Sequence, residues 1–163
     1  MTRPVGTLIL GLALLAGPGC GRKGPLELPP GREPAPAERV TAALENGAVV
    51  LTWANPVKAV SGKPLGPLEA IEIWVLEGAG PAAGTAPAPA EIEAEARLAL
   101  RIATDGREAT MSRSVPVPEG AKRLAFTVRV RDRRGRVSAF SPWAVVDVAR
   151  APEGPAPAES EGP

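Results

Sequence analysis

Short runs in which apolar and polar residues alternate recur through the middle of the chain. They are separated by turns rich in Gly and Pro, and they cover residues 47–53, 71–75, 124–132 and 144–148. In the first run, Val49, Leu51 and Trp53 fall on one face of an extended chain. Alternation with a period of two over such short runs is typical of an antiparallel sheet that has one face in water. The pattern therefore predicts an all-β fold built as a sandwich.

In two of these runs the alternation assigns a face to each side chain. The inward positions are apolar: Ile71, Ile73, Val75, Phe126, Val128 and Val130. The outward positions are mostly polar: Glu72, Thr127, Arg129 and Arg131. Trp74 is the exception, because it falls on the outer face. An aromatic side chain there marks a partner surface or is covered by the loop of residues 78–90, and the pattern leaves both alternatives open.

The segment that follows this loop fits two kinds of element. Its composition favours a helix, but in a long helix Glu91 and Glu95 would be like charges four residues apart, which is unfavourable. We expect a short helical turn over residues 91–95 and then a strand over about residues 97–102. A further strand is expected within residues 107–118.

The N-terminus has the layout of a processing signal. Arg3 supplies a positive charge, residues 5–15 are almost wholly apolar, and small residues directly precede Cys20, as in a bacterial lipoprotein. The apolar run is too short to cross a bilayer, which needs about 20 residues. We therefore predict a signal peptide over residues 1–19 and lipid attachment at Cys20. Gly17 stands where such signals usually carry Leu, and an ordinary cleaved signal with a stray thiol, or a short anchor helix, is the alternative.

Low-complexity segments flank the region of alternating runs. Prolines and glycines over residues 20–37 predict an extended tether. Residues 150–163 hold too few apolar side chains to order, so we predict a disordered tail there. Residues 38–149 remain as the folded domain.

The composition removes most enzyme classes. The chain of 163 residues contains no His, and Cys20 is its only Cys, so Ser-His-Asp sites, Cys-His sites and metal sites built on imidazole are excluded. Of the 19 Lys and Arg residues, Arg3 is lost with the signal, which leaves 18 against 18 Asp and Glu. Without a net side-chain charge, no global field draws the mature chain onto nucleic acid. We expect no catalytic residue, no cofactor, no metal and no nucleic-acid partner.

Several stretches together resemble the fibronectin type III family. The first run, with Trp53 followed by Ala-Asn-Pro, matches the family's second strand, and residues 71–77 and 126–148 match a later strand and the last hairpin. The resemblance covers about residues 34–149. It implies an antiparallel immunoglobulin-like sandwich of about seven strands with a binding or scaffolding role. The family usually carries Tyr where this chain has Phe126, so the hydroxyl anchor of that corner is missing.

The predicted tether carries a second resemblance. Residues 20–30, CGRKGPLELPP, are similar to the start of the small lipoproteins associated with the lipopolysaccharide-transport translocon of Gram-negative outer membranes. The translocon contacts that this resemblance implies are Gly21, Lys23, Gly24, Pro25 and Leu26. The residue after Cys20 is Gly and not Asp, which in the usual Gram-negative sorting logic implies delivery to the outer membrane.

Five arginines lie close together around the end of the third run. With Trp74 they are candidates for an anion or partner surface: Arg129, Arg131, Arg133, Arg134 and Arg136. Guanidinium groups suit phosphate and carboxylate, and outside the cytoplasm lipid phosphates are the expected targets. The alternative is a solvated strand face that reaches a tight turn at residues 132–135, where Gly135 supplies a positive φ.

These features together predict a lipid-anchored protein of the outer membrane that faces the periplasm. Its fibronectin type III-like domain is expected to act as a binding or scaffolding module without catalysis. The alternative is an auxiliary lipoprotein of an outer-membrane assembly machine, of the lipopolysaccharide-transport type, that acts through its tether. The expected partners are the membrane, through the lipid anchor, and an envelope protein. The sequence leaves the oligomeric state open.

Overall fold

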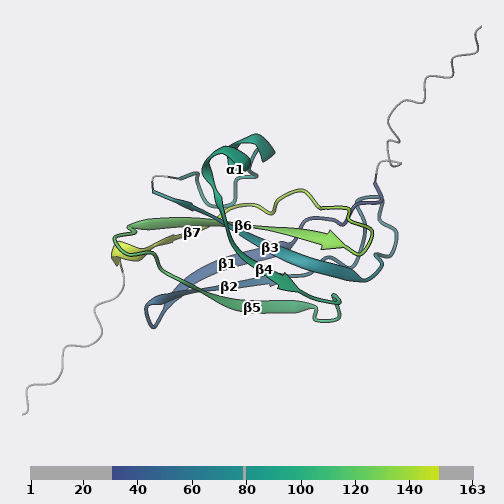
Figure 1. Ribbon diagram of the computed structural model, residues 1–163, viewed down its shortest axis with the longest axis horizontal. Helices are drawn as coiled ribbons and strands as arrows, with labels where there is room; N and C mark the ends of the chain where they lie inside the picture. The colour runs from purple at the N-terminus through teal and green to yellow at the C-terminus, as the bar shows by residue number, and fades with distance from the viewer. Residues whose placement is uncertain (1–30, 79, 151–163) are drawn as a thin grey trace, which may run out of the picture.

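Two antiparallel sheets lie face to face in the computed structural model, which describes residues 31–78 and 80–150 (Figure 1). One sheet has the strand order β1-β2-β5 and the other has the order β4-β3-β6-β7. The elements are β1 (Glu38–Glu45), β2 (Ala48–Ala54), β3 (Leu68–Glu77), α1 (Pro89–Glu95), β4 (Arg97–Ala103), β5 (Thr110–Pro116), β6 (Arg123–Asp132), β7 (Ala144–Asp147) and the short 3-10 helix η1 (Val148–Arg150). The predicted all-β, immunoglobulin-like sandwich is confirmed.

Most elements lie where the sequence predicts them. The four alternating runs form β2, β3, β6 and β7, and the helical turn and the strand after it are α1 and β4. The sequence patterns do not predict β1. Its core-facing residues Val40, Ala42 and Leu44 are only partly buried, because β1 lies at the edge of its sheet. All three inward positions are therefore near the surface, and because Ala42 is also small, the apolar signal is weak.

The main core lies between the two sheets and contains the predicted inward side chains. Val49, Leu51 and Trp53 from β2 are fully buried, and Ile71 and Phe126 meet them from the opposite sheet. Burying such side chains contributes about 1.5–3 kcal/mol each. The alternation of β2, β3 and β6 therefore correctly identifies the inner face of the sandwich.

A second, smaller apolar cluster covers the outer face of the four-stranded sheet. Ile92 of α1 is fully buried there with Ala125, Phe140 and Trp143, and Trp74 packs against them. In Figure 1, α1 lies on the side of this sheet that faces away from β1, β2 and β5. The outer face of β3 and β6 is therefore partly covered, and Trp74 is half-buried.

The chain enters the sandwich along a fixed path. Residues 31–37, which the sequence analysis places in the tether, lie against the loop between β2 and β3. The amide of Ala35 donates to the carbonyl of Lys58 (3.1 Å), and the amide of Ser61 donates to the carbonyl of Gly31 (2.8 Å). Pro34, between them, is fully buried. The folded unit therefore begins several residues before the predicted boundary at residue 38.

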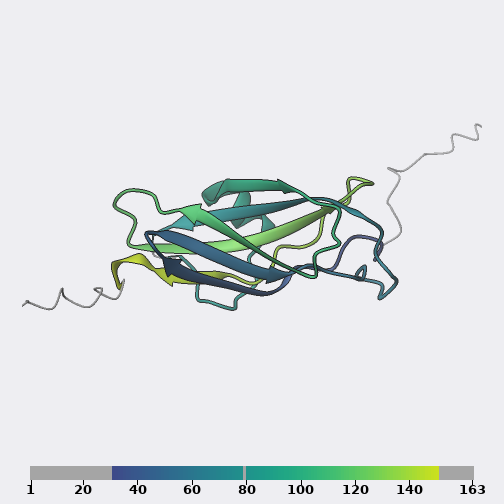
Figure 2. The same ribbon diagram turned by 90° about the horizontal axis from the view of Figure 1, so that it is seen from below.

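The two ends of the described chain lie at opposite ends of the sandwich. Gly31 is bonded to Ser61 in the loop between β2 and β3, whereas the end of the described chain after β7 lies at the other end of the sandwich (Figures 1 and 2). The predicted signal peptide (1–19) and almost all of the predicted tail (150–163) lie outside the described residues. Within the described ranges, no helix is long and apolar enough to cross a membrane.

Candidate anion-binding site

A tight turn at the end of β6 forms one wall of the candidate site. The amide of Gly135 donates to the carbonyl of Asp132 (2.9 Å), and Gly135 has a φ of 78°, as the predicted hairpin turn requires. The Asp132 side chain is buried and holds the turn from inside. Its Oδ1 accepts from the amides of Arg134 (2.9 Å) and Arg136 (3.0 Å), and its Oδ2 accepts from the Arg136 guanidinium.

These contacts lower the pKa of the Asp132 carboxyl. Burial by itself raises the pKa of the carboxyl, but the hydrogen bond from the Arg136 side chain, the two amide hydrogen bonds and the Arg136 charge outweigh it. The pKa is therefore held below its ordinary value of 3.8. Because Asp132 is already satisfied by Arg136 and by the turn, it does not neutralise other cations nearby.

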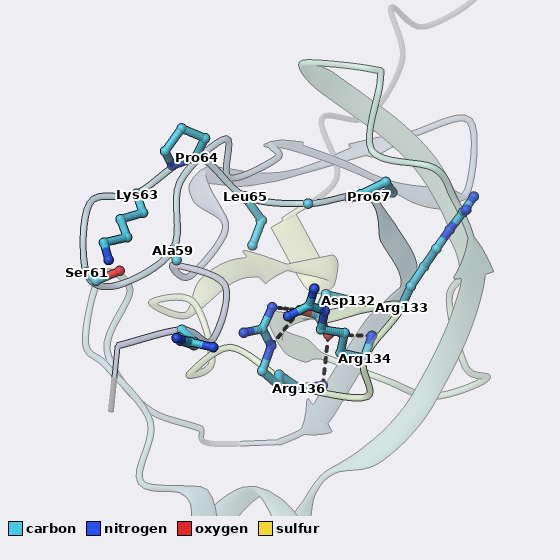
Figure 3. Close-up of a pocket in the computed structure, with 12 residues that line it drawn as sticks. Ala59, Ser61, Lys63, Pro64, Leu65, Pro67, Asp132, Arg133, Arg134 and Arg136 are labelled. Carbon is cyan, nitrogen blue, oxygen red and sulfur yellow. Dashed lines mark hydrogen bonds and ion pairs between the residues drawn. The ribbon is translucent and has the colours of Figure 1, made fainter. Parts of the chain in front are cut away.

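A pocket of about 330 Å³ opens between this turn, the loop joining β2 to β3, and the start of the described chain. Four exposed basic residues line it: Arg32, Lys63, Arg133 and Arg134. Figure 3 shows Lys63 on one side of the pocket and Arg134 and Arg136 on the other. Among the described residues none of these four exposed cations forms an ion pair. We call the four residues the basic cluster.

The structure separates the five arginines that the sequence groups into one surface. Only Arg133 and Arg134 belong to the basic cluster with side chains free of ion pairs. Arg136 lines the same pocket but is bound to Asp132. Arg129 and Arg131 are directed instead to a carboxylate on the outer face of the sheet. The candidate anion site is therefore smaller than the predicted set, and it takes two of its cations from other segments.

That carboxylate is Glu72, which corrects the expectation that it faces water. Glu72 is on the outer face of β3, as the alternation predicts, but only 4% of it is exposed. The Arg129 guanidinium donates to its Oε2 through Nε (2.9 Å) and Nη2 (2.7 Å). Arg131 and Arg101 approach its Oε1 at 3.5 and 4.0 Å. One buried carboxylate thus forms ion pairs with three arginines.

The pKa of Glu72 follows from this arrangement. Burial by itself raises it, but the hydrogen bond from Arg129 and the charges of Arg129, Arg131 and Arg101 outweigh burial. The pKa is held below its ordinary value of 4.5.

Thr127 is a second residue that the alternation places on the outer, water-facing side of the sheet. It is instead fully buried, and its hydroxyl donates to the carbonyl of Ser141 (2.7 Å).

Trp74 belongs to this outer-face network and not to the pocket. The Arg129 guanidinium lies over the rings of Trp74 (5.4 Å to the centroid) and Phe140 (4.8 Å), and the two rings meet edge to face at 6.0 Å. Such contacts stabilise a cation by about 0.5–2 kcal/mol. Trp74 is half-buried, and the residues that pack against it are Phe140, Arg129 and the apolar cluster around Ile92, none of which belongs to the loop of residues 78–90. A role of Trp74 in a partner surface stays a prediction.

No sequence pattern singles out Arg32 or Lys63. Each is an isolated basic residue in a stretch rich in Pro and Gly, and each is far along the chain from Arg133 and Arg134. Only the folding of the sandwich brings them to one end. No spacing rule could have found them, because the pairing of Leu68 with Asp132 places the two loops together.

The remaining predicted site residues lie outside the described residues. These are the lipid-attachment residue Cys20 and the implied tether contacts Gly21, Lys23, Gly24, Pro25 and Leu26. In the ranges 31–78 and 80–150, no group of three or more Asp, Glu, His or Cys side chains is arranged to hold a metal ion.

Comparison of the chain with models of known protein families gave no match. Comparison with curated proteins gave no significant match either.

Proposed function

We propose that this chain is a lipid-anchored protein of the bacterial outer membrane, facing the periplasm, whose sandwich is a non-catalytic binding module. The apolar run, the small residues before Cys20 and Gly21 after it support the anchor and the destination. The sandwich is compatible with a module that binds an envelope protein or an anionic group through its loops, because loops on a rigid scaffold commonly carry binding residues.

The observation that carries the proposal is the fixed entry of the chain at the basic cluster. A backbone hydrogen bond holds Gly31 against Ser61, and two residues that line the pocket lie close to them in sequence: Arg32 follows Gly31, and Lys63 is two residues after Ser61. The end of the sandwich that bears the basic cluster is therefore the end to which an anchor at Cys20 would be tied. A binding surface and its attachment point thus coincide.

The state of the buried carboxylates supports a binding role over a catalytic one. A general acid needs a pKa raised towards neutrality. Glu72 and Asp132 are the buried acidic residues of the described chain, and arginines hold the pKa of each below its ordinary value. Both serve to pair arginines and to hold backbone geometry.

The anchor is tested by replacing Cys20. In cells fed a labelled fatty acid, the parent chain should carry the label and fractionate with the outer membrane. Cys20→Ser removes the acyl acceptor and should abolish both, and a nearby control, Lys23→Gln, should abolish neither. A labelled, membrane-bound Cys20→Ser chain would contradict the proposal.

The role of the sandwich is tested by cross-linking in intact cells. A chain that ends at residue 33 keeps the anchor and residues 20–33 of the tether but lacks every strand. We expect it to lose the envelope protein that cross-links to the full chain. If the shortened chain retains the same partner, the tether carries the interaction, and the binding-module proposal is wrong.

A further inference from the structure

We propose that the end of the sandwich bearing the basic cluster docks on the anionic phospholipid surface of the membrane to which Cys20 is tied. This inference rests on the proposed lipid anchor and names the ligand of the pocket as the phosphate groups of lipids. The docking end consists of the basic cluster together with Val57 and Val60, from the loop between β2 and β3.

The charge of this end matches a phosphate-bearing surface. The basic cluster contributes four positive charges from three separate segments, and none of them is neutralised by an ion pair within the described ranges. Asp132, the acidic residue of the pocket lining, is already bound by Arg136. Arginine forks bind phosphate oxygens in a bidentate manner, and lysine adds a flexible point charge.

Two exposed apolar side chains lie in the same loop as Lys63. Val57 is 70% exposed and Val60 is 57% exposed, and they are two of the three large hydrophobic residues that are exposed among the described residues. The third, Leu98, lies on β4. Apolar side chains flanked by cations are typical of surfaces that rest in the headgroup region of a bilayer, where the apolar groups enter the acyl boundary and the cations remain at the phosphates.

The loop that carries these residues is held in place before any ligand binds. The amide of Ala59 donates to the carbonyl of Lys63 (2.9 Å), the amide of Leu65 donates to the carbonyl of Val57 (3.0 Å), and the amide of Val60 donates to the carbonyl of Glu33 (3.0 Å). A preorganised loop loses little conformational entropy on binding. Docking therefore requires no rearrangement of the end that contacts the lipid.

The tether brings the docking end to the bilayer. Residues 20–30 join Cys20 to the described chain, and eleven residues span at most about 40 Å. Binding by a surface so close to its anchor is intramolecular, with an effective concentration of the order of millimolar. Stable attachment of lipidated proteins commonly combines acyl chains with a basic surface, and the docking end supplies that second contact.

The test uses the mature chain from residue 20 with Cys20→Ser, which keeps all described residues and has no acyl chain. Binding is measured by co-sedimentation with vesicles of phosphatidylcholine and phosphatidylglycerol in equal parts, and with vesicles of phosphatidylcholine alone. We expect binding to the mixed vesicles, weaker binding as salt rises, and little binding to the neutral ones.

The decisive variant is the triple change Lys63→Gln, Arg133→Gln and Arg134→Gln. Each basic residue at an anionic surface raises the partition coefficient about fivefold, so the triple variant should lose about a hundredfold. The matched control is Arg97→Gln, Arg113→Gln and Lys122→Gln, which removes the same charge from the middle and far end of the sandwich. The control should retain most of the binding.

The apolar part is tested by Val57→Ser with Val60→Ser. This variant should keep its salt-sensitive binding but lose several-fold in affinity at high salt, where apolar contacts carry most of what remains. All changed side chains are exposed or partly exposed, so the melting temperature of every variant should stay close to that of the parent.

Three outcomes would overturn the docking proposal. The first is no binding of the parent to the mixed vesicles. The second is an equal loss in the pocket variant and the control. The third is full competition by millimolar glycerol phosphate, which would indicate a site for a small soluble anion. None of these depends on acylation. Labelled fatty acid on Cys20 in cells without vesicle binding in vitro would therefore reject docking and leave the anchor standing.

Discussion

At the residue scale, Glu72 connects several strands through ion pairs, although it occupies an outward position of β3. Its cross-strand partners are Arg129 on β6 and Arg101 on β4. The guanidinium of Arg129 in turn lies over the rings of Trp74 and Phe140. A single carboxylate therefore connects three strands and the aromatic pair on the outer face, and its loss leaves a largely buried arginine without its counter-ion.

Glu72→Gln should accordingly lower the free energy of unfolding by about 2–3 kcal/mol, because removing one partner of a buried ion pair leaves the other uncompensated. The matched control is Glu77→Gln, whose pair with Arg97 is about half exposed on both sides, and which should change stability by less than about 1 kcal/mol. Urea unfolding followed by tryptophan fluorescence measures both. Equal effects in the two variants would show that the Glu72 network is no stronger than a surface pair.

The alternation of the sequence predicts the side of β3 on which Glu72 lies but not its burial. Period two distinguishes the two faces of a strand, and it assigned Ile71 and Ile73 correctly. Whether the outer face is exposed to water depends on which side chains from other segments pack over it. Here the Arg129 guanidinium pairs with the carboxylate and itself lies over the ring of Phe140, which no local pattern links to Glu72.

At the element scale, two serines in the segment between the turn and β7 form hydrogen bonds with the edge of β6 through their hydroxyl groups and their amides. The hydroxyl of Ser138 accepts from the amide of Val130 (3.0 Å), and the hydroxyl of Ser141 accepts from the amide of Val128 (2.9 Å). The serine amides donate back to the carbonyls of the same two valines. Each serine thus takes both hydrogen-bonding positions that a regular strand residue would use.

Ser141→Ala removes the acceptor of a buried amide. Because Ser141 is fully buried and Thr127 also contacts it, no water is placed to replace the hydroxyl, and we expect a loss of about 1–3 kcal/mol. Ser114→Ala, at an exposed position of β5, should change stability by less than about 0.5 kcal/mol. Thermal unfolding measures the difference. Hydrogen exchange should also show faster exchange of the Val128 amide, and an unchanged rate would contradict the assigned hydrogen bond.

The limits of prediction differ between elements for a physical reason. Strands β2, β3 and β6 are central in their sheets, and their strong alternation reflects full burial of one face. Edge strand β1 buries small or partly exposed residues, so its pattern is weak. The irregular segment around Ser138 and Ser141 shows no such alternation, because its pairing with β6 combines serine hydroxyls with backbone amides instead of a regular ladder.

At the scale of the whole molecule, the two buried carboxylates link stability to pH. The pKa values of Glu72 and Asp132 are lower in the folded chain than their ordinary values of 4.5 and 3.8. A group with a lowered folded pKa stabilises the fold above its unfolded pKa and loses that contribution as the pH falls through the folded pKa. Stability should therefore be flat down to about pH 5 and should decrease below that value.

Melting temperatures measured in a pH series test this expectation. The decrease should be smaller in Glu72→Gln, which has no titrating group at that position. A melting temperature that is the same at neutral and at strongly acidic pH would show that neither carboxylate is stabilised in the folded state.

The basic cluster could not have been predicted at this scale, and the reason is topological. Arg32 precedes the first strand, Lys63 lies between β2 and β3, and Arg133 and Arg134 follow β6. The sequence groups the last two with three further arginines, and Glu72 and Asp132, which pair with those three, divide the group in the folded chain. Only the sandwich places three separate loops at one end.

The opposite positions of Gly31 and Arg150 also determine how the domain would bear a mechanical load. Suppose that the anchor pulls at Gly31 while a partner pulls at the far end. The force then acts at the N-terminal end of β1 and at the C-terminal end of β7, in opposite directions. The hydrogen bonds that join β1 to β2 and β7 to β6 lie across that direction, so the whole ladder is in shear and its bonds must rupture together. Pulling on the paired residues Glu38 and Ala54 would instead open the ladder one bond at a time. Single-molecule stretching should therefore require a higher force between residues 31 and 150 than between residues 38 and 54, as expected of a module that stays folded while tied to a membrane.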